Sequence, residues 1–176
     1  MKRVETVLGL ILLAGGSGFV ASTRLAAADE AAPATAYYAL VGNWHGSGEL
    51  AEPGQPPAKL ALALACRKAA SGWAVARDLN AHNESMTMTE TDLMGVDSLT
   101  GQGHWYAITN GGDTHDHLSS WPAANTMKAR CKWTQDGKGM EEDITFKFSG
   151  KHGLAFRSMV TADGAPAGSF SGSLTR

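Results

Sequence analysis

The sequence lacks an excess of positive charge, and it has only two cysteines among its 176 residues. Its formal net charge is −2, so nothing in the composition attracts nucleic acid or an anionic membrane surface, and we expect neither as a partner. Two cysteines, Cys66 and Cys131, are too few for a disulfide framework in a domain of this size. They could form a single bridge or be two small buried hydrophobic residues, and the sequence leaves both possibilities open.

A long hydrophobic run is also missing. The apolar stretch from Val7 to Leu13 is much shorter than the roughly 20 residues that span a bilayer, and two basic residues precede it. Together with a small-x-small pattern that ends at Ala28, this is typical of a signal peptide. We predict a signal peptide over residues 1–28 and a periplasmic or secreted protein with no integral membrane segment after cleavage. A retained anchor is the alternative.

Signals for helices are almost absent after the first 36 residues. Most stretches alternate between apolar and polar residues and soon stop at Gly, Asp, Asn or Pro, which is the period-two pattern of half-buried strands. The alternation from Leu60 to Cys66 is a clear example. The pattern predicts ten strands, over residues 38–50, 59–68, 73–79, 87–96, 103–110, 113–121, 127–133, 141–148, 154–161 and 168–175.

Ten short strands joined mostly by tight turns predict a meander, and a meander of this length hides its edges by closing on itself. We therefore predict an all-β fold, a single antiparallel up-and-down barrel of about 8–10 strands over residues 37–176, after a flexible leader at residues 29–36. Such a barrel has room for side chains and one small ligand. A two-sheet sandwich fits the same periodicity, but we find no long crossing loop.

The segment from Gly42 to Gly48 reads G-x-W-x-G-x-G, with Trp44 as its tryptophan. It resembles the opening strand of calycin barrels, the group of lipocalins, fatty-acid-binding proteins and nitrobindin-like proteins. The stretch from Gly95 to Gly101 and the hairpin that follows it resemble exported bacterial proteins of the DUF1579 type, which are lipocalin-like barrels of unknown function. The resemblance implies a lipocalin-like barrel with the Trp44 ring buried at one end.

The sequence departs from these families in ways that matter for cofactors. The T-D-Y motif and the C-terminal helix of lipocalins are missing. Nitrobindin-like haem binders bring an axial histidine from near the C-terminus, whereas the last histidine here is His152. The resemblance therefore implies a fold, and the cofactor, if there is one, stays unknown.

Signatures of catalysis are missing as well. There is no G-x-S-x-G elbow, and no serine has a distinguishing context. Cys66 lies on the apolar face of its predicted strand, where a thiol is usually inert. The acidic residues 141–143 look like the solvated start of a strand. The sequence therefore favours a binding protein and leaves open whether the chain is an enzyme.

The histidines of one predicted hairpin are the strongest candidates for a site. Gly111 and Gly112 are typical of a two-residue turn, and such a turn would pair Ile108 with His115 and Tyr106 with His117. Because residues two apart on a strand share a face, one face would carry His104, Tyr106, Ile108, His115, His117, Ser119 and Trp121. We predict that this face turns inward, since the opposite choice would leave the Asp116 carboxylate unpaired in the lumen.

Three functions follow from these features. The leading hypothesis is an exported barrel that binds a small, largely apolar ligand through Trp44, Tyr106, His115, His117 and Trp121. The second is a metal-binding or metal-dependent protein, because three imidazoles, His104, His115 and His117, could converge on one ion from this hairpin. The third is a packed barrel without a cavity, which acts as a surface interaction module. The composition does not indicate an oligomeric state.

Overall fold

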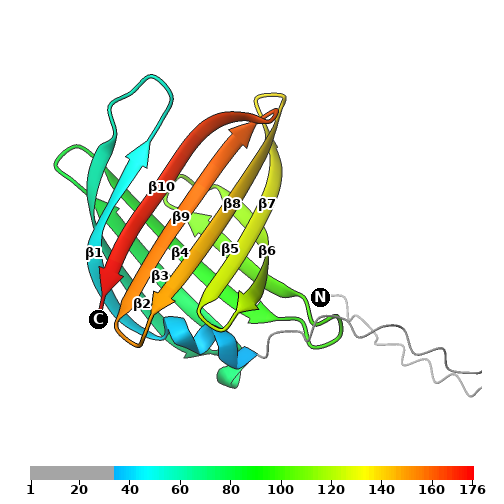
Figure 1. The fold of residues 1–176 in the computed structure, drawn as a ribbon. Helices are drawn as coiled ribbons and strands as arrows, with labels where there is room; N and C mark the ends of the chain where they lie inside the picture. Colours follow the sequence, from blue (N-terminus) through cyan, green and yellow to red (C-terminus); the bar gives the residue numbers. More distant parts are fainter. Residues whose placement is uncertain (1–33) are drawn as a thin grey trace, which may run out of the picture.

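The computed structural model describes residues 34–176, which form one closed antiparallel barrel of ten strands (Figure 1). Each strand pairs with its neighbours in sequence, and β10 closes the barrel by pairing with β1. The strands are β1 (Gly42–Ala51), β2 (Ala58–Ala69), β3 (Ala74–His82), β4 (Thr87–Val96), β5 (Gly103–Thr109), β6 (Thr114–Ala123), β7 (Thr126–Gln135), β8 (Lys138–Ser149), β9 (Gly153–Ala162) and β10 (Ala165–Thr175). The predicted all-β meander barrel is confirmed.

The alternation of side chains places the core inside the barrel. In β2, Leu60, Leu62 and Leu64 are buried, while the residues between them face outward. Burying a leucine side chain stabilises the fold by roughly 1.5–3 kcal/mol. The same alternation in most of the other strands gives the barrel a largely apolar lumen.

A short 3-10 helix, η1 (Ala34–Leu40), closes one end of the barrel (Figure 1). Its side chains at positions three apart lie on the same side, and Tyr37 and Leu40 are both fully buried. The Tyr37 hydroxyl and the Ser119 Oγ are 2.6 Å apart. Residues 38–40, predicted to begin the first strand, are therefore helical, and η1 also includes residues 34–36 of the predicted leader. The predicted signal peptide and residues 29–33 lie outside the described residues.

Trp44 lies at this closed end, as the calycin resemblance implies. Its side chain has no exposed surface, and its Nε1 donates a 2.7 Å hydrogen bond to the Leu40 carbonyl. The glycines of the motif let β1 pass close to β10. A Cβ at Gly46 would lie 2.0 Å from the Ser173 carbonyl oxygen, so only glycine fits this approach.

The β5–β6 hairpin differs by one residue from the predicted register. Trp105 pairs with His117. The Thr109 amide donates to the Asp113 carbonyl and the Thr109 carbonyl accepts from the Gly112 amide, so three residues, 110–112, form the loop. Gly112 has a φ of +86°, in the left-handed region. Because the loop is one residue longer than predicted, the pairing shifts by one residue and each β5 side chain lies on the opposite face from the predicted one.

Both cysteines are buried with free thiols, so the single bridge that the sequence left open is not formed. Burial raises the pKa of the Cys66 thiol to about 11, which makes it unreactive at neutral pH. In the part of the chain that the structure describes, no helix has the length and apolar character needed to cross a membrane.

Candidate ligand-binding cavity

A cavity of about 330 Å³ occupies the barrel lumen, and its lining includes Leu50, Gln135 and Ala167 at the strand ends away from η1. Its volume lies at the lower end of the roughly 300–1,000 Å³ that small-molecule sites span. More than half of the residues that line it are apolar, namely Leu50, Leu64, Leu79, Met88, Trp105, Trp133, Met140, Ile144, Phe146, Phe156, Val160, Ala167 and Phe170. The lumen is therefore not fully packed, in contrast to the third hypothesis of a barrel without a cavity.

Aromatic rings form much of the wall. The Phe156 ring lies 5.7 Å from Phe146 and 5.0 Å from Phe170, so a continuous row of rings runs from the deep lumen to β10. On the other side, the Trp133 and His115 rings meet edge to face at 4.6 Å. These contacts fix the rings in place, and a ligand would enter a site with preformed apolar walls.

Arg77, on β3, is held deep in the lumen by two carboxylates of β4. Its Nε donates to Asp92 and its Nη2 donates to Glu90. The Trp105 Nε1 donates to the second oxygen of Asp92 at 2.8 Å, and the guanidinium lies 4.5 Å from the Trp105 ring centroid. Burial acts to lower the pKa of Arg77, but the two carboxylates outweigh it and the pKa is raised. Arg77 is therefore charged and already paired.

A second polar group lies across the cavity on β8. Glu142 accepts from the Ser158 hydroxyl through one oxygen, and its other oxygen lies 2.9 Å from His117 Nε2. Burial acts to raise the pKa of Glu142, but these two hydrogen bonds together with the charges of the His117 and His115 imidazoles outweigh it, so the pKa is lowered. Glu142 is therefore an ionised carboxylate that borders an apolar space.

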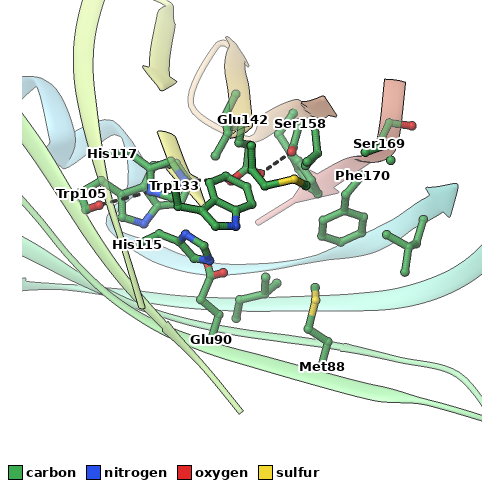
Figure 2. A pocket seen from close by; sticks show the side chains of 18 of the residues that line it. Met88, Glu90, Trp105, His115, His117, Trp133, Glu142, Ser158, Ser169 and Phe170 are labelled. Atoms are coloured by element: carbon green, nitrogen blue, oxygen red, sulfur yellow. Dashed lines mark hydrogen bonds and ion pairs between the residues drawn. The ribbon is translucent and has the colours of Figure 1, made fainter. Parts of the chain in front are cut away.

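Figure 2 shows how these groups lie around the cavity. Glu142 and Ser158 are on one wall, and Glu90 rises from the opposite wall, with the His115, His117 and Trp133 rings at the side. The His115 and His117 ring centroids are 6.0 Å apart. The polar groups thus gather in one region, while the apolar wall continues toward Phe170.

The structure brings together only part of the predicted site. His115 and His117 line the cavity, and Asp116 faces outward, as the desolvation argument required. Trp44 and Trp121 do not line the cavity. Trp121 packs at the closed end instead, against Tyr37 and Phe148.

The prediction that His104 and Tyr106 face the lumen is wrong, because the hairpin register is shifted by one residue. The Tyr106 side chain is 48% exposed on the outer face, and His104 Nδ1 lies there 3.2 Å from Asp116. The predicted convergence of His104, His115 and His117 on one metal ion is therefore not found. Residues 34–176 contain no group of three histidine, cysteine or acidic side chains arranged to hold a metal.

The charged residues of the lumen were not predicted from the sequence, although each one left a signal. Arg77 occupies the inward position between Val75 and Leu79 in the alternation of β3. Glu142 likewise continues the inward series of Ile144 and Phe146. A charged residue in register with buried apolar residues points into the lumen, and such a position is a candidate for a functional site.

Comparison with known proteins supports the fold without identifying a family. No protein-family model and no curated protein matches the sequence. Among solved structures, Rv2717c from M. tuberculosis has a TM-score of 0.63 and 15% identity, and the match covers 82% of this chain and 98% of that one. The fold is that of a lipocalin-like barrel. The specific resemblance to DUF1579-type and nitrobindin-like proteins is not confirmed.

Two further solved structures share this lipocalin-like barrel. A DUF3598-family protein of unknown function from Nostoc punctiforme has a TM-score of 0.54 and 12% identity, over 86% of this chain and 53% of that one. The S-type phycobiliprotein lyase CPES from Guillardia theta has a TM-score of 0.54 and 10% identity, over 83% and 93%. Identities this low show a common fold alone.

Proposed function

We propose that this protein is an exported lipocalin-like carrier that binds one small, largely apolar ligand in the barrel lumen. The observation that carries the proposal is the cavity of about 330 Å³ with aromatic walls. A similar barrel in Guillardia theta is a phycobiliprotein lyase, which is consistent with a barrel that takes a small ligand.

The energetics favour an apolar body for this ligand. Transfer of apolar surface from water stabilises a complex by about 25 cal/mol per Å², and the rings of Phe156, Phe170 and Trp133 offer such surface without having to be ordered first. Of the residues predicted to bind the ligand, His115 and His117 keep this role in the proposal. Trp133 and Phe170 take the places of Tyr106 and Trp121.

A neutral fluorescent dye tests the proposal directly. N-phenyl-1-naphthylamine is unprotonated at neutral pH, and its emission rises when it leaves water for an apolar site. We expect a saturable rise with one dye per protein. Val160→Trp, which fills the cavity from β9, should weaken dye binding by at least about tenfold.

The adjacent residue provides the matched control. Met159 lies on the same strand but faces outward and is 42% exposed, so Met159→Trp adds the same ring outside the barrel. Circular dichroism checks that both variants stay folded. The proposal is wrong if the wild-type protein binds no dye, or if both tryptophan variants weaken binding equally.

A further inference from the structure

The carboxyl groups in the lumen outnumber the lysine and arginine side chains there. Glu90, Asp92 and Glu142 point inward from β4 and β8, whereas Arg77 is the one lysine or arginine among the described residues that line the cavity. Asp92 offsets the charge of Arg77, and Glu142 then has no lysine or arginine partner among the described residues. Charges are expensive to bury unless they are paired. The lumen therefore has room beside Glu142 for a permanent positive charge, which no lysine or arginine among the described residues supplies.

An anionic ligand would find no unpaired lysine or arginine among the described residues that line the cavity. The Arg77 side chain is 4% exposed, and its Nε and Nη2 already donate to Asp92 and Glu90. Its guanidinium also lies against the Trp105 ring. Binding a carboxylate or phosphate would bring a further negative charge beside these carboxylates, with no second lysine or arginine among the described lining residues to offset it.

The carboxylates, in contrast, can accept more hydrogen bonds. An ionised carboxylate has about four acceptor positions, and Glu142 uses one on each oxygen, toward His117 and Ser158. The structure gives Glu90 one donor, from Arg77. Both side chains keep nearly a fifth of their surface accessible, at 19% and 18%, and both border the cavity from opposite walls (Figure 2).

The aromatic wall supplies a second feature that suits a cation. The Trp133 and Phe156 rings border the same space as Glu142, and the π-face of an aromatic ring attracts a positive charge. A group that is positively charged and donates several hydrogen bonds satisfies the carboxylates and the rings together.

We propose that the ligand is an aliphatic or arylalkyl amine, bound with its ammonium group at Glu142 and Glu90 and its apolar body among the aromatic rings. This inference rests on the proposed function, since it names the chemical class of the molecule in the same cavity. Glu142 is the principal contact, because its partners hold it as an ionised carboxylate. Glu90 completes the site from the opposite wall.

A matched series of three molecules tests the end group while the apolar body stays constant. The probes are 4-phenylbutylamine, 4-phenylbutanol and 4-phenylbutyrate, each titrated against wild-type protein loaded with N-phenyl-1-naphthylamine. We expect the amine to displace the dye at a concentration at least about tenfold lower than the alcohol, because a hydrogen bond to a charged group exceeds one between neutral groups. The carboxylate should be the weakest of the three.

Glu142→Gln should reduce the preference for the amine over the alcohol to less than about threefold, because it removes the charge and keeps an acceptor for His117 and Ser158. Glu141→Gln is the matched control. Glu141 is next along β8, faces outward and pairs with Arg130 and Lys132, so its loss should leave the preference unchanged.

The outcomes separate the two proposals. If the wild-type protein does not bind the dye, the carrier function itself is wrong. If the dye binds but the alcohol or the carboxylate displaces it as well as the amine does, the carrier function stands and the amine proposal is overturned. An amine preference that persists unchanged in folded Glu142→Gln also overturns it.

Discussion

Glu90 shows what burial does to a single side chain in this barrel. Desolvation raises its pKa to about 7, and although the neighbouring Arg77 acts in the opposite direction, Asp92 raises it further. Since Glu90 and Asp92 interact, the pKa of about 7 describes the uptake of one proton by the two carboxyl groups together. The ordinary glutamate pKa is 4.5. The folded state therefore holds a proton that the unfolded chain releases at lower pH.

This difference predicts how stability changes with pH. The stabilisation linked to the proton on Glu90 is fully present below the unfolded pKa of 4.5 and is lost as the pH rises through about 7. Glu90→Gln mimics the protonated acid and removes the titration. From about pH 5 to about pH 8, the wild type should lose on the order of 2 kcal/mol relative to Glu90→Gln.

Urea unfolding of both proteins across this pH range measures the loss. Glu49→Gln is the control, because Glu49 is exposed on the outer face of β1, and this variant should follow the pH dependence of the wild type. Identical pH slopes for Glu90→Gln and the wild type would show that Glu90 is ionised throughout the range.

Single residues also show what the sequence could predict about the site. His115 and His117 were correctly placed inward, because the Asp116 between them could not be buried without a partner. Arg77 and Glu142 were missed because a charged residue in an alternating strand usually lies at the surface. Their partners come from other strands, and nothing local in the sequence shows that Arg77 meets Asp92 or that Glu142 meets His117.

At the scale of the element, strands were easier to predict than their register. The period-two alternation is a local property, so all ten strands were found, with boundaries wrong by a few residues. Register depends on turn conformation instead. Gly111-Gly112 fits a two-residue turn, but the loop begins at Asn110 and places only Gly112 in the left-handed region. The predicted loop was therefore one residue too short, which placed His104 and Tyr106 on the inner face in the prediction, whereas they lie on the outer face.

The η1 helix was missed because two buried residues, Tyr37 and Leu40, give too short a pattern to separate a 3-10 turn from the start of a strand. Its attachment to the barrel depends on Trp44, which is fully buried and donates to the Leu40 carbonyl. Removing that ring opens a cavity under the helix and leaves the carbonyl without its donor.

Trp44→Ala should therefore lower the free energy of unfolding by about 3–5 kcal/mol, as expected for a buried aromatic residue. Urea denaturation followed by circular dichroism measures this loss. Trp73 is the matched control, because it is 64% exposed, and Trp73→Ala should change stability by less than about 0.5 kcal/mol. A Trp44→Ala protein as stable as Trp73→Ala would mean that the ring does not close the barrel.

For the whole molecule, the closed barrel followed from the sequence while its cavity did not. Ten antiparallel strands with short connections hide their edges best by closing, and β10 does pair with β1. Whether the lumen is filled depends on how side chains from all ten strands pack together. The row formed by Phe146, Phe156 and Phe170 leaves space beside it, and only the assembled barrel shows this.

The proposed export also concerns the whole molecule, since it determines where the mature chain begins. Cleavage before Asp29 would leave the closing helix intact, because η1 begins at Ala34. A cut beyond Tyr37 would remove the side chain that reaches Ser119 and would open the closed end of the barrel. Cleavage at the small-x-small pattern would therefore keep all of η1 and of the barrel.

We expect N-terminal sequencing of the protein from the periplasmic or secreted fraction to begin within a few residues of Asp29. Removal of three basic residues and one acidic residue should also change the net charge from −2 to about −4, which isoelectric focusing detects as a more acidic band. Ala26→Leu with Ala28→Leu blocks the small-residue positions and should leave uncleaved precursor. Recovery of the wild-type chain in the membrane fraction with Met1 intact would show instead that the N-terminal segment is a retained anchor.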